Sequence, residues 1–161
     1  EGCSSLASIE IPSSVTSIED RAFEGCSSLA SIEIPSSVTS IGDFAFYDCE
    51  KLTVITIPAS VTNIGEAAFE YCRGLTAATI GNSVTSIGNR AFYDCALTSI
   101  TIPASVTNIG EYAFGYCIGL QTINYNDTML QYKVITKGEN WHSEVPASYV
   151  TCTDGQINID I

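Results

Sequence analysis

The sequence predicts a mostly β solenoid of stacked short parallel strands, with one helical turn per repeat and a C-terminal β cap. Cysteines fall at positions 3, 26, 49, 72, 95 and 117, so the intervals between them are four of 23 residues and one of 22. A fixed period of roughly 20–50 residues is typical of a solenoid, in which each unit packs on its neighbours. Residues 1–18 are also identical to residues 24–41, which favours a regular stack.

The second copy of the repeat shows how one unit is expected to fold. Residues 29–34 read Leu-x-x-Ile-x-Ile, a spacing that predicts a strand with alternating side chains in its second half. Pro35 lacks an N–H group and ends that strand. A second short extended piece is expected over 38–41. After it, Asp43 is expected to begin a single helical turn that buries the apolar residues 45–46.

These residues resemble a known family. The phrase Ile-Pro-Ser-Ser-Val-Thr-Ser-Ile-Gly, followed by Ala-Phe and then Cys, looks like the BspA-like leucine-rich repeat family of cell-surface and secreted proteins. The resemblance covers about residues 1–125, in five copies. Trp141 and residues 150–155 are similar to the segment that closes such arrays, although Asp127-Thr128 replaces the usual Gly-Thr and Tyr132 stands where Trp is expected. The resemblance implies a leucine-rich-repeat solenoid at an extracellular or cell-surface location.

Two regions follow from the repeat pattern. Residues 1–125 are expected to form an array of five full repeats, one of them of 22 residues, plus a partial sixth. Residues 126–161 are expected to form a capping segment. Within it, residues 133–135 are expected to be a short strand, and residues 149–161 a β-hairpin around the Asp154-Gly155 turn.

The two ends of the stack are expected to differ. Trp141 is expected to act as the lid that covers the apolar face of the last repeat. The chain begins inside a repeat, so we interpret it as part of a longer array. Its first repeat exposes an apolar edge that includes Ile9 and Ile11 and is blunted by Glu10 and Pro12. Because open strand edges pair with other chains, we expect self-association through this end.

Repeat four is expected to be the least stable unit. It carries Ala78 where the neighbouring repeats place Ile32, Ile55 and Ile100, and Gly81 where they place proline. The smaller side chain is expected to leave a void in the core. The glycine is expected to loosen the end of the strand.

Charge and hydropathy exclude several classes of partner. The formal net charge is −12, which argues against binding to nucleic acids or anionic membrane surfaces, because both need basic patches. The sequence contains no run of 18 apolar residues, so no transmembrane segment is expected. Its first residues do not match a signal peptide.

The repeated cysteines are expected to be reduced and buried. Neighbouring strands lie about 4.8 Å apart, which makes disulfides between repeats conceivable. However, such bonds would strain the coil, and buried thiols serve well as small apolar side chains. Because the sequence has no Cys-x-x-Cys pair, we predict no zinc site.

No catalytic, cofactor-binding or metal-binding residue is predicted. The single histidine, His142, lies beside Trp141 and is interpreted as a packing or surface residue. Phosphate-binding loops and nucleophile elbows are absent from the sequence. One repeat position is mostly acidic, and its side chains are expected to cap the helical turns; it contains Asp20, Asp43, Glu66, Asn89 and Glu111.

Candidate binding residues lie in outward columns. Tyrosines recur just before the cysteines and suit a protein or glycan partner, although packing between turns explains them equally well: Tyr47, Tyr71, Tyr93 and Tyr116. A second candidate column follows the outward strand positions Glu10, Glu33, Thr56, Thr79 and Thr101. A third column of Ser-x-Thr pairs runs from Ser14 and Thr16 to Ser105 and Thr107.

Three functions fit these columns. The leading hypothesis is a non-enzymatic binding module of an extracellular cell-surface or secreted protein, for adhesion or partner recognition, with an extracellular protein or glycan as ligand. The alternative is a purely structural spacer or stalk. A remote alternative, suggested by the Ser-x-Thr column, is an ice- or crystal-binding array. An enzyme is not expected, because stacked copies repeat the same groups and no site converges.

Overall fold

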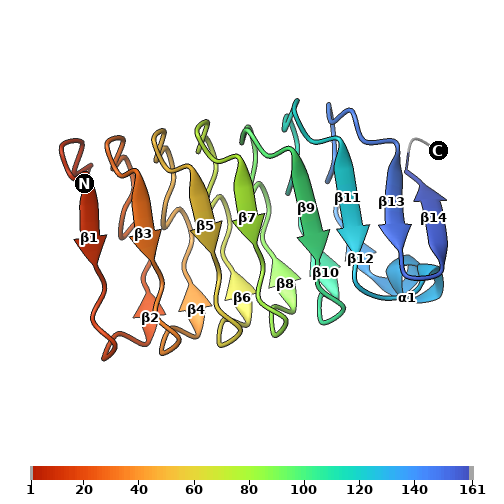
Figure 1. The fold of residues 1–161 in the computed structure, drawn as a ribbon, viewed down its shortest axis with the longest axis horizontal. Helices are drawn as coiled ribbons and strands as arrows, with labels where there is room; N and C mark the ends of the chain where they lie inside the picture. Colours follow the sequence, from red (N-terminus) through yellow and green to blue (C-terminus); the bar gives the residue numbers. More distant parts are fainter. Residues whose placement is uncertain (1, 160–161) are drawn as a thin grey trace.

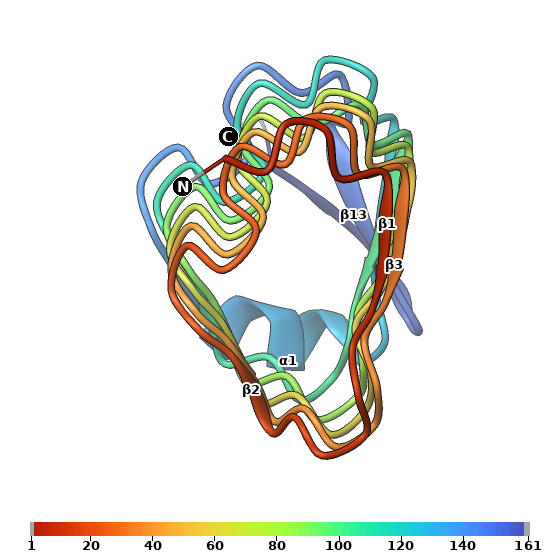
Figure 2. The ribbon, with the colours of Figure 1, turned by 90° about the vertical axis from the view of Figure 1, so that its left-hand side faces the viewer.

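The computed structural model describes residues 2–159 as a stack of coils, one per repeat. Figure 2 looks along the stack and shows successive coils following the same path. Each coil contributes one strand to the face that we call the first-strand face and a shorter strand to a second face. The first-strand face contains β1 (Ser8–Glu10), β3 (Ser31–Glu33), β5 (Val54–Thr56), β7 (Ala77–Thr79), β9 (Ser99–Ile102), β11 (Thr122–Tyr125) and β13 (Tyr149–Cys152) (Figure 1).

The second face is a continuous six-stranded parallel sheet. Its strands are β2 (Ser17–Ile18), β4 (Ser40–Ile41), β6 (Asn63–Ile64), β8 (Ser86–Ile87), β10 (Asn108–Ile109) and β12 (Thr136–Lys137). The register matches equivalent residues, as in Ile18 opposite Ile41. The first-strand face is also parallel, and Ile9 lies opposite Ile32 there. The predicted parallel solenoid is therefore confirmed.

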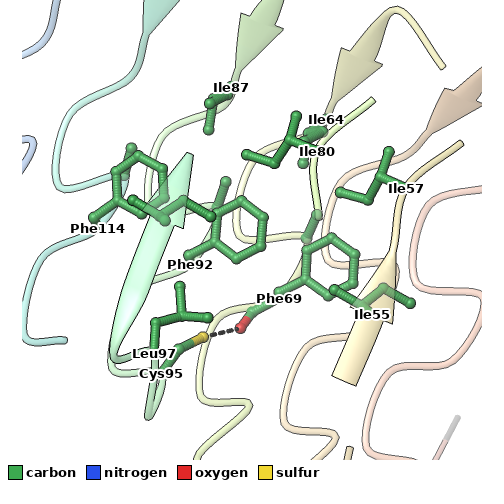
Figure 3. Close-up of a cluster of buried hydrophobic side chains, with 14 of the residues drawn as sticks. Ile55, Ile57, Ile64, Phe69, Ile80, Ile87, Phe92, Cys95, Leu97 and Phe114 are labelled. Atoms are coloured by element: carbon green, nitrogen blue, oxygen red, sulfur yellow. Dashed lines mark hydrogen bonds between the residues drawn. The ribbon is translucent and has the colours of Figure 1, made fainter. Parts of the chain in front are cut away.

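Columns of identical side chains fill the interior. The rings of Phe23, Phe46, Phe69, Phe92 and Phe114 form one stack, with neighbouring centroids 5.1–5.4 Å apart and planes within 12° of each other. Figure 3 shows part of this stack beside the isoleucine columns. Each ring can lie flat on the next because the repeat length keeps equivalent residues in register.

The predicted helical turn is wrong. Residues 43–48 form a run of turns, in which Phe44 and Asp48 have left-handed φ angles of 56° and 58°. The N–H groups of Phe44, Phe46 and Asp48 donate to carbonyl groups of the following coil. A helical turn would direct these N–H groups along its own axis, whereas this conformation uses them to join neighbouring coils.

The acidic column caps this run of turns and not a helix. An Asp43 Oδ1 atom accepts a hydrogen bond of 2.7 Å from the Glu66 N–H group of the next coil. In the same way, Asp20 Oδ1 accepts a hydrogen bond from the Asp43 N–H group, and Asn89 Oδ1 accepts one from the Glu111 N–H group. These side chains therefore tie each coil to its neighbour.

The cysteine thiols form a comparable ladder. Each of the Sγ atoms of Cys49, Cys72, Cys95 and Cys117 donates to a phenylalanine carbonyl oxygen 3.0–3.2 Å away, on an earlier coil. Figure 3 shows the bond from Cys95 to Phe69. Burial raises the pKa of the Cys49 and Cys117 thiols to about 12, which keeps them protonated donors. Cys3 differs from the expected core position, because it lies in the first coil and is exposed.

Repeat four departs from its neighbours at two positions, Ala78 and Gly81. Ala78 faces the interior opposite Ile55 but is only half-buried. A Cβ atom on Gly81 would lie 2.4 Å from the Pro58 carbonyl oxygen. The glycine therefore permits a close approach of two coils, and its loosening of the strand end stays a prediction.

The coil geometry continues past residue 125. The strand expected over 133–135 is wrong, because α1 (Met129–Val134) occupies that stretch, with Thr128 as its N-cap. The Thr128 hydroxyl accepts from the Gln131 N–H group, and Tyr132 is the buried residue of the helix. Strand β12 follows α1 directly and pairs with β10, so the helix is an insertion in a sixth coil.

The predicted hairpin and lid close the stack. Strands β13 and β14 (Gly155–Asn158) pair antiparallel around a turn at 153–154; the last two residues of the expected hairpin lie outside the described residues. Trp141 is 6% exposed. Its ring packs edge-on against Phe114 with centroids 6.2 Å apart, so it covers the end of the phenylalanine stack.

The opposite end is open among the described residues. Ile9 is 41% exposed, and Ile11, Val15 and Phe23 are only partly buried. Together with Ile18 they line a hollow of about 270 Å³. The sequence identified this apolar edge correctly.

Candidate interaction surface

The tyrosine column forms a continuous strip along the turns that precede the cysteines. Ring centroids are 5.5 Å apart for Tyr47 and Tyr71, 5.9 Å for Tyr71 and Tyr93, and 5.2 Å for Tyr93 and Tyr116. Tyr116 is 43% exposed, while the other three rings are half-buried. Packing between turns therefore explains part of the column, and the accessible ring surface remains available for contact.

Backbone conformation brings these rings into line. Tyr47 and Tyr93 stand two residues before a cysteine, but Tyr71 and Tyr116 stand one residue before it. The residue that directly precedes the cysteine is left-handed, with φ of 61° at Tyr71 and 59° at Tyr116. Bulky residues seldom adopt this conformation. Backbone hydrogen bonds to the turn of the next coil hold both tyrosines in this conformation.

All three arginines of the chain lie over aromatic rings of this edge. Arg73 Cζ lies 5.0 Å from the Tyr71 centroid, Arg90 Cζ lies 5.5 Å from that of Tyr93, and Arg21 Cζ lies 4.5 Å from that of Phe44. We call the four tyrosines with Arg73 and Arg90 the tyrosine strip. Sequence reasoning missed the arginines. Their confinement to the turns of the repeats was the available signal.

Carboxylates hold the guanidinium groups in place. Arg73 pairs with Asp94 at 3.0 Å and with Glu50 at 3.8 Å, and Arg90 pairs with Glu70 at 3.8 Å. Glu70 is 4% exposed, and its burial raises the pKa of its carboxyl group against the opposing effect of Arg90. Because these partners restrain the arginines, the strip presents guanidinium and phenol groups in fixed positions.

The outward strand column is exposed, as predicted. In β3, β5 and β9 these residues alternate with buried neighbours, whereas the neighbour is exposed in β1 and half-buried in β7. The column on the first-strand face contains Glu10, Glu33, Thr56, Thr79 and Thr101. Glu10 and Glu33 lie directly opposite each other in the register of β1 and β3. Within residues 2–159, no side-chain hydrogen bond or ion pair joins this column to the tyrosine strip.

The threonines of the Ser-x-Thr column serve the stack itself. The Thr39 hydroxyl donates to the Thr16 carbonyl oxygen at 3.1 Å, and Thr85 and Thr107 make the same bond to the preceding coil. The hydroxyl protons are therefore used within the protein.

His142 lies in the C-terminal cap, directly beside Trp141. Its ring packs against Trp141 with centroids 4.6 Å apart, beside a hollow of about 320 Å³ in the cap that Tyr132 and Lys137 also line. Across residues 2–159, no three side chains of His, Cys, Asp or Glu gather closely enough to hold a metal ion. Within the same range, no helix has the length and apolar character needed to span a membrane.

Several solved structures resemble this chain. A leucine-rich repeat protein of T. pallidum shares 36% identity and a TM-score of 0.77, over 85% of this chain and 62% of that one. A leucine-rich cell surface protein of Faecalibacterium prausnitzii shares 38% identity and a TM-score of 0.58, over 74% and 38%. A leucine-rich repeat protein of Bacteroides ovatus shares 26% identity and a TM-score of 0.67, over 89% and 51%. The chain thus spans less than two thirds of each of these proteins.

A family model agrees with these structures. The model described as a BspA type leucine rich repeat region matches residues 1–132 in six copies. No curated protein sequence matched the chain. The repeat phrase, the coil geometry and the family model together confirm the resemblance in the sequence: the chain belongs to the BspA-type leucine-rich repeat family.

Proposed function

We propose that this chain is a non-enzymatic binding module of an extracellular cell-surface or secreted protein, which recognises a protein or glycan partner. The family and the F. prausnitzii cell surface protein support this location. A solenoid also offers an extended surface for recognition. Adhesion is the form of partner recognition that we favour.

The tyrosine strip is the observation that carries the proposal. Tyr and Arg are the residue types enriched at the centres of protein interfaces. Here they lie on one edge of a chain with net charge −12, and ion pairs already hold Arg73 and Arg90. Less conformational entropy is therefore lost on binding. The outward strand column of Glu10, Glu33, Thr56, Thr79 and Thr101 is our second candidate face.

Two other functions are less well supported. A spacer needs no exposed aromatic surface, yet Tyr116 remains 43% exposed beside Ile118, which is 77% exposed. An ice-binding array needs hydroxyl groups that are free to bond water, but those of Thr39, Thr85 and Thr107 bond the backbone.

A binding panel tests the proposal. The chain would be applied to purified extracellular proteins and to a glycan array. The variant Tyr71→Ser with Tyr116→Ser should lower affinity for any partner by at least about tenfold. Tyr149→Ser is the matched control, because Tyr149 is 50% exposed but lies outside the strip, on β13. Equal losses in both variants would contradict the role of the strip, and no binding by the folded chain would favour the spacer.

A further inference from the structure

The first-strand face is divided into separate sheets. Strand β1 pairs with β3 and β5 pairs with β7, but among residues 2–159 no ladder joins β3 to β5. The Thr53 N–H group still donates to the Ala30 carbonyl oxygen across this seam, at 3.4 Å. The equivalent bonds in the neighbouring coils, Ala30 to Ala7 and Thr76 to Thr53, are 3.1 and 3.0 Å. The two strands therefore lie side by side, but they are not paired by a regular ladder of hydrogen bonds.

A groove of about 470 Å³ lies over this seam. It is lined by Ser31, Ile32, Glu33, Ile34, Val54 and Thr56. Val54 is 52% exposed. The equivalent outward position holds serine in the first two repeats and alanine in the fourth. The groove thus has an apolar wall that its neighbours lack.

One carboxylate lines the groove, and a second lies beside it on the neighbouring strand. Glu33 lines it and also lines an adjacent hollow of about 220 Å³ that Glu10 shares. Both are exposed and lie opposite each other in the register of β1 and β3, and neither forms an ion pair with another of residues 2–159. Like charges directly opposite in a sheet are destabilising. A cation from a partner would remove that repulsion. The three arginines of the chain lie elsewhere, over the aromatic rings of the turn edge.

We propose that the seam groove between β3 and β5 binds an arginine side chain carried by a partner polypeptide. Arginine fits both features of the groove. Its methylene stem can cover the apolar wall at Val54 and Ile32, as long basic side chains do on apolar surfaces. Its planar fork offers five N–H donors, enough to engage Glu33 and Glu10 on strands about 4.8 Å apart. This inference rests on the proposed binding function. It names the partner chemistry for the outward strand column, the second candidate binding surface.

An NMR titration of the whole ¹⁵N-labelled chain tests this inference. The probe is the peptide Ac-Gly-Arg-Gly-NH₂, and the matched control carries citrulline, which has the shape of arginine without its charge. We expect saturable shifts at the amides of residues 31–34 and 54–56 with arginine, and none with citrulline. Glu33→Gln should weaken binding about three- to fivefold, the range of an exposed ion pair, and Val54→Ser should weaken it as well.

Three controls make the result decisive. Glu66→Gln and Glu111→Gln change exposed carboxylates away from the groove and should leave arginine binding unchanged. So should Tyr71→Ser, which separates this site from the tyrosine strip. The proposal is overturned if the shifts spread evenly over the acidic surface, if citrulline binds as well as arginine, or if Glu66→Gln weakens binding as much as Glu33→Gln. If arginine binds the groove but no partner is found for the tyrosine strip, only the proposed role of the strip is refuted.

Discussion

Filling the interior at Ala78 should stabilise the chain. Ala78 faces the core between columns of isoleucine, where Ile55 and Ile100 are 0% and 2% exposed, yet Ala78 itself is only half-buried. The change Ala78→Ile adds three carbon atoms, each worth about 0.8 kcal/mol when fully buried. We therefore expect a gain of about 2 kcal/mol in the free energy of unfolding. For a chain of this length, that corresponds to a rise of roughly 4–8 °C in Tm.

Urea and thermal unfolding, followed by circular dichroism, would measure this gain. The matched control is Ala77→Ile on the same strand, because Ala77 points outward and is exposed. It should change stability by no more than about 0.5 kcal/mol. If Ala78→Ile instead lowers stability, the space beside Ala78 is already filled, for example by a shifted Leu75, and the account of repeat four as the least stable unit fails.

Three further predictions concern the thiols and the open end. Thiol titration after denaturation without reductant should count about seven free thiols; a count near one or three would contradict the reduced ladder. The pKa values of the Cys49 and Cys117 thiols are raised from 9.0 to about 12, so the stability that these two thiols contribute should be complete below pH 9 and fall as pH rises toward 12. Cys49→Ala should remove up to about 1.4 kcal/mol per pH unit from that slope, whereas an unchanged slope would mean that this thiol is not buried in solution. Light scattering should show self-association of the chain, and charged substitutions at Ile9 and Ile11 should abolish it. A monomer at high concentration would contradict self-association through the N-terminal edge.

Much of the fold could be predicted because the same residues recur in register. Period-two alternation around Ile32 and Ile34 specifies a strand with one buried side, and 23-residue copies stack like on like. The turns could not be predicted in the same way. A short apolar stretch such as 45–46 fits one helical turn as well as a run of turns, and the choice is made by hydrogen bonds to the next coil.

The candidate surface was predictable only in part. The tyrosines stood out by their recurrence, whereas the arginines over them depend on contacts between coils. Arg73 directly follows Cys72, but its best ion pair is with Asp94 at the far end of the same repeat, 21 residues along the chain. The helix α1 could not be predicted for a similar reason. Its start depends on the Thr128 cap and on Asp154 in the turn of the hairpin, which accepts a hydrogen bond from the Met129 N–H group.

The most direct test of the central claim is a hydrogen-exchange footprint of the chain bound to a partner from the binding panel. We predict that binding slows exchange in the turns that carry the tyrosine strip, at residues 44–48, 67–73, 90–95 and 112–118. The second face, formed by the sheet from β2 to β12, should be unaffected. Slowed exchange confined to the Thr16–Thr107 column, with no change in these turns, would contradict the account.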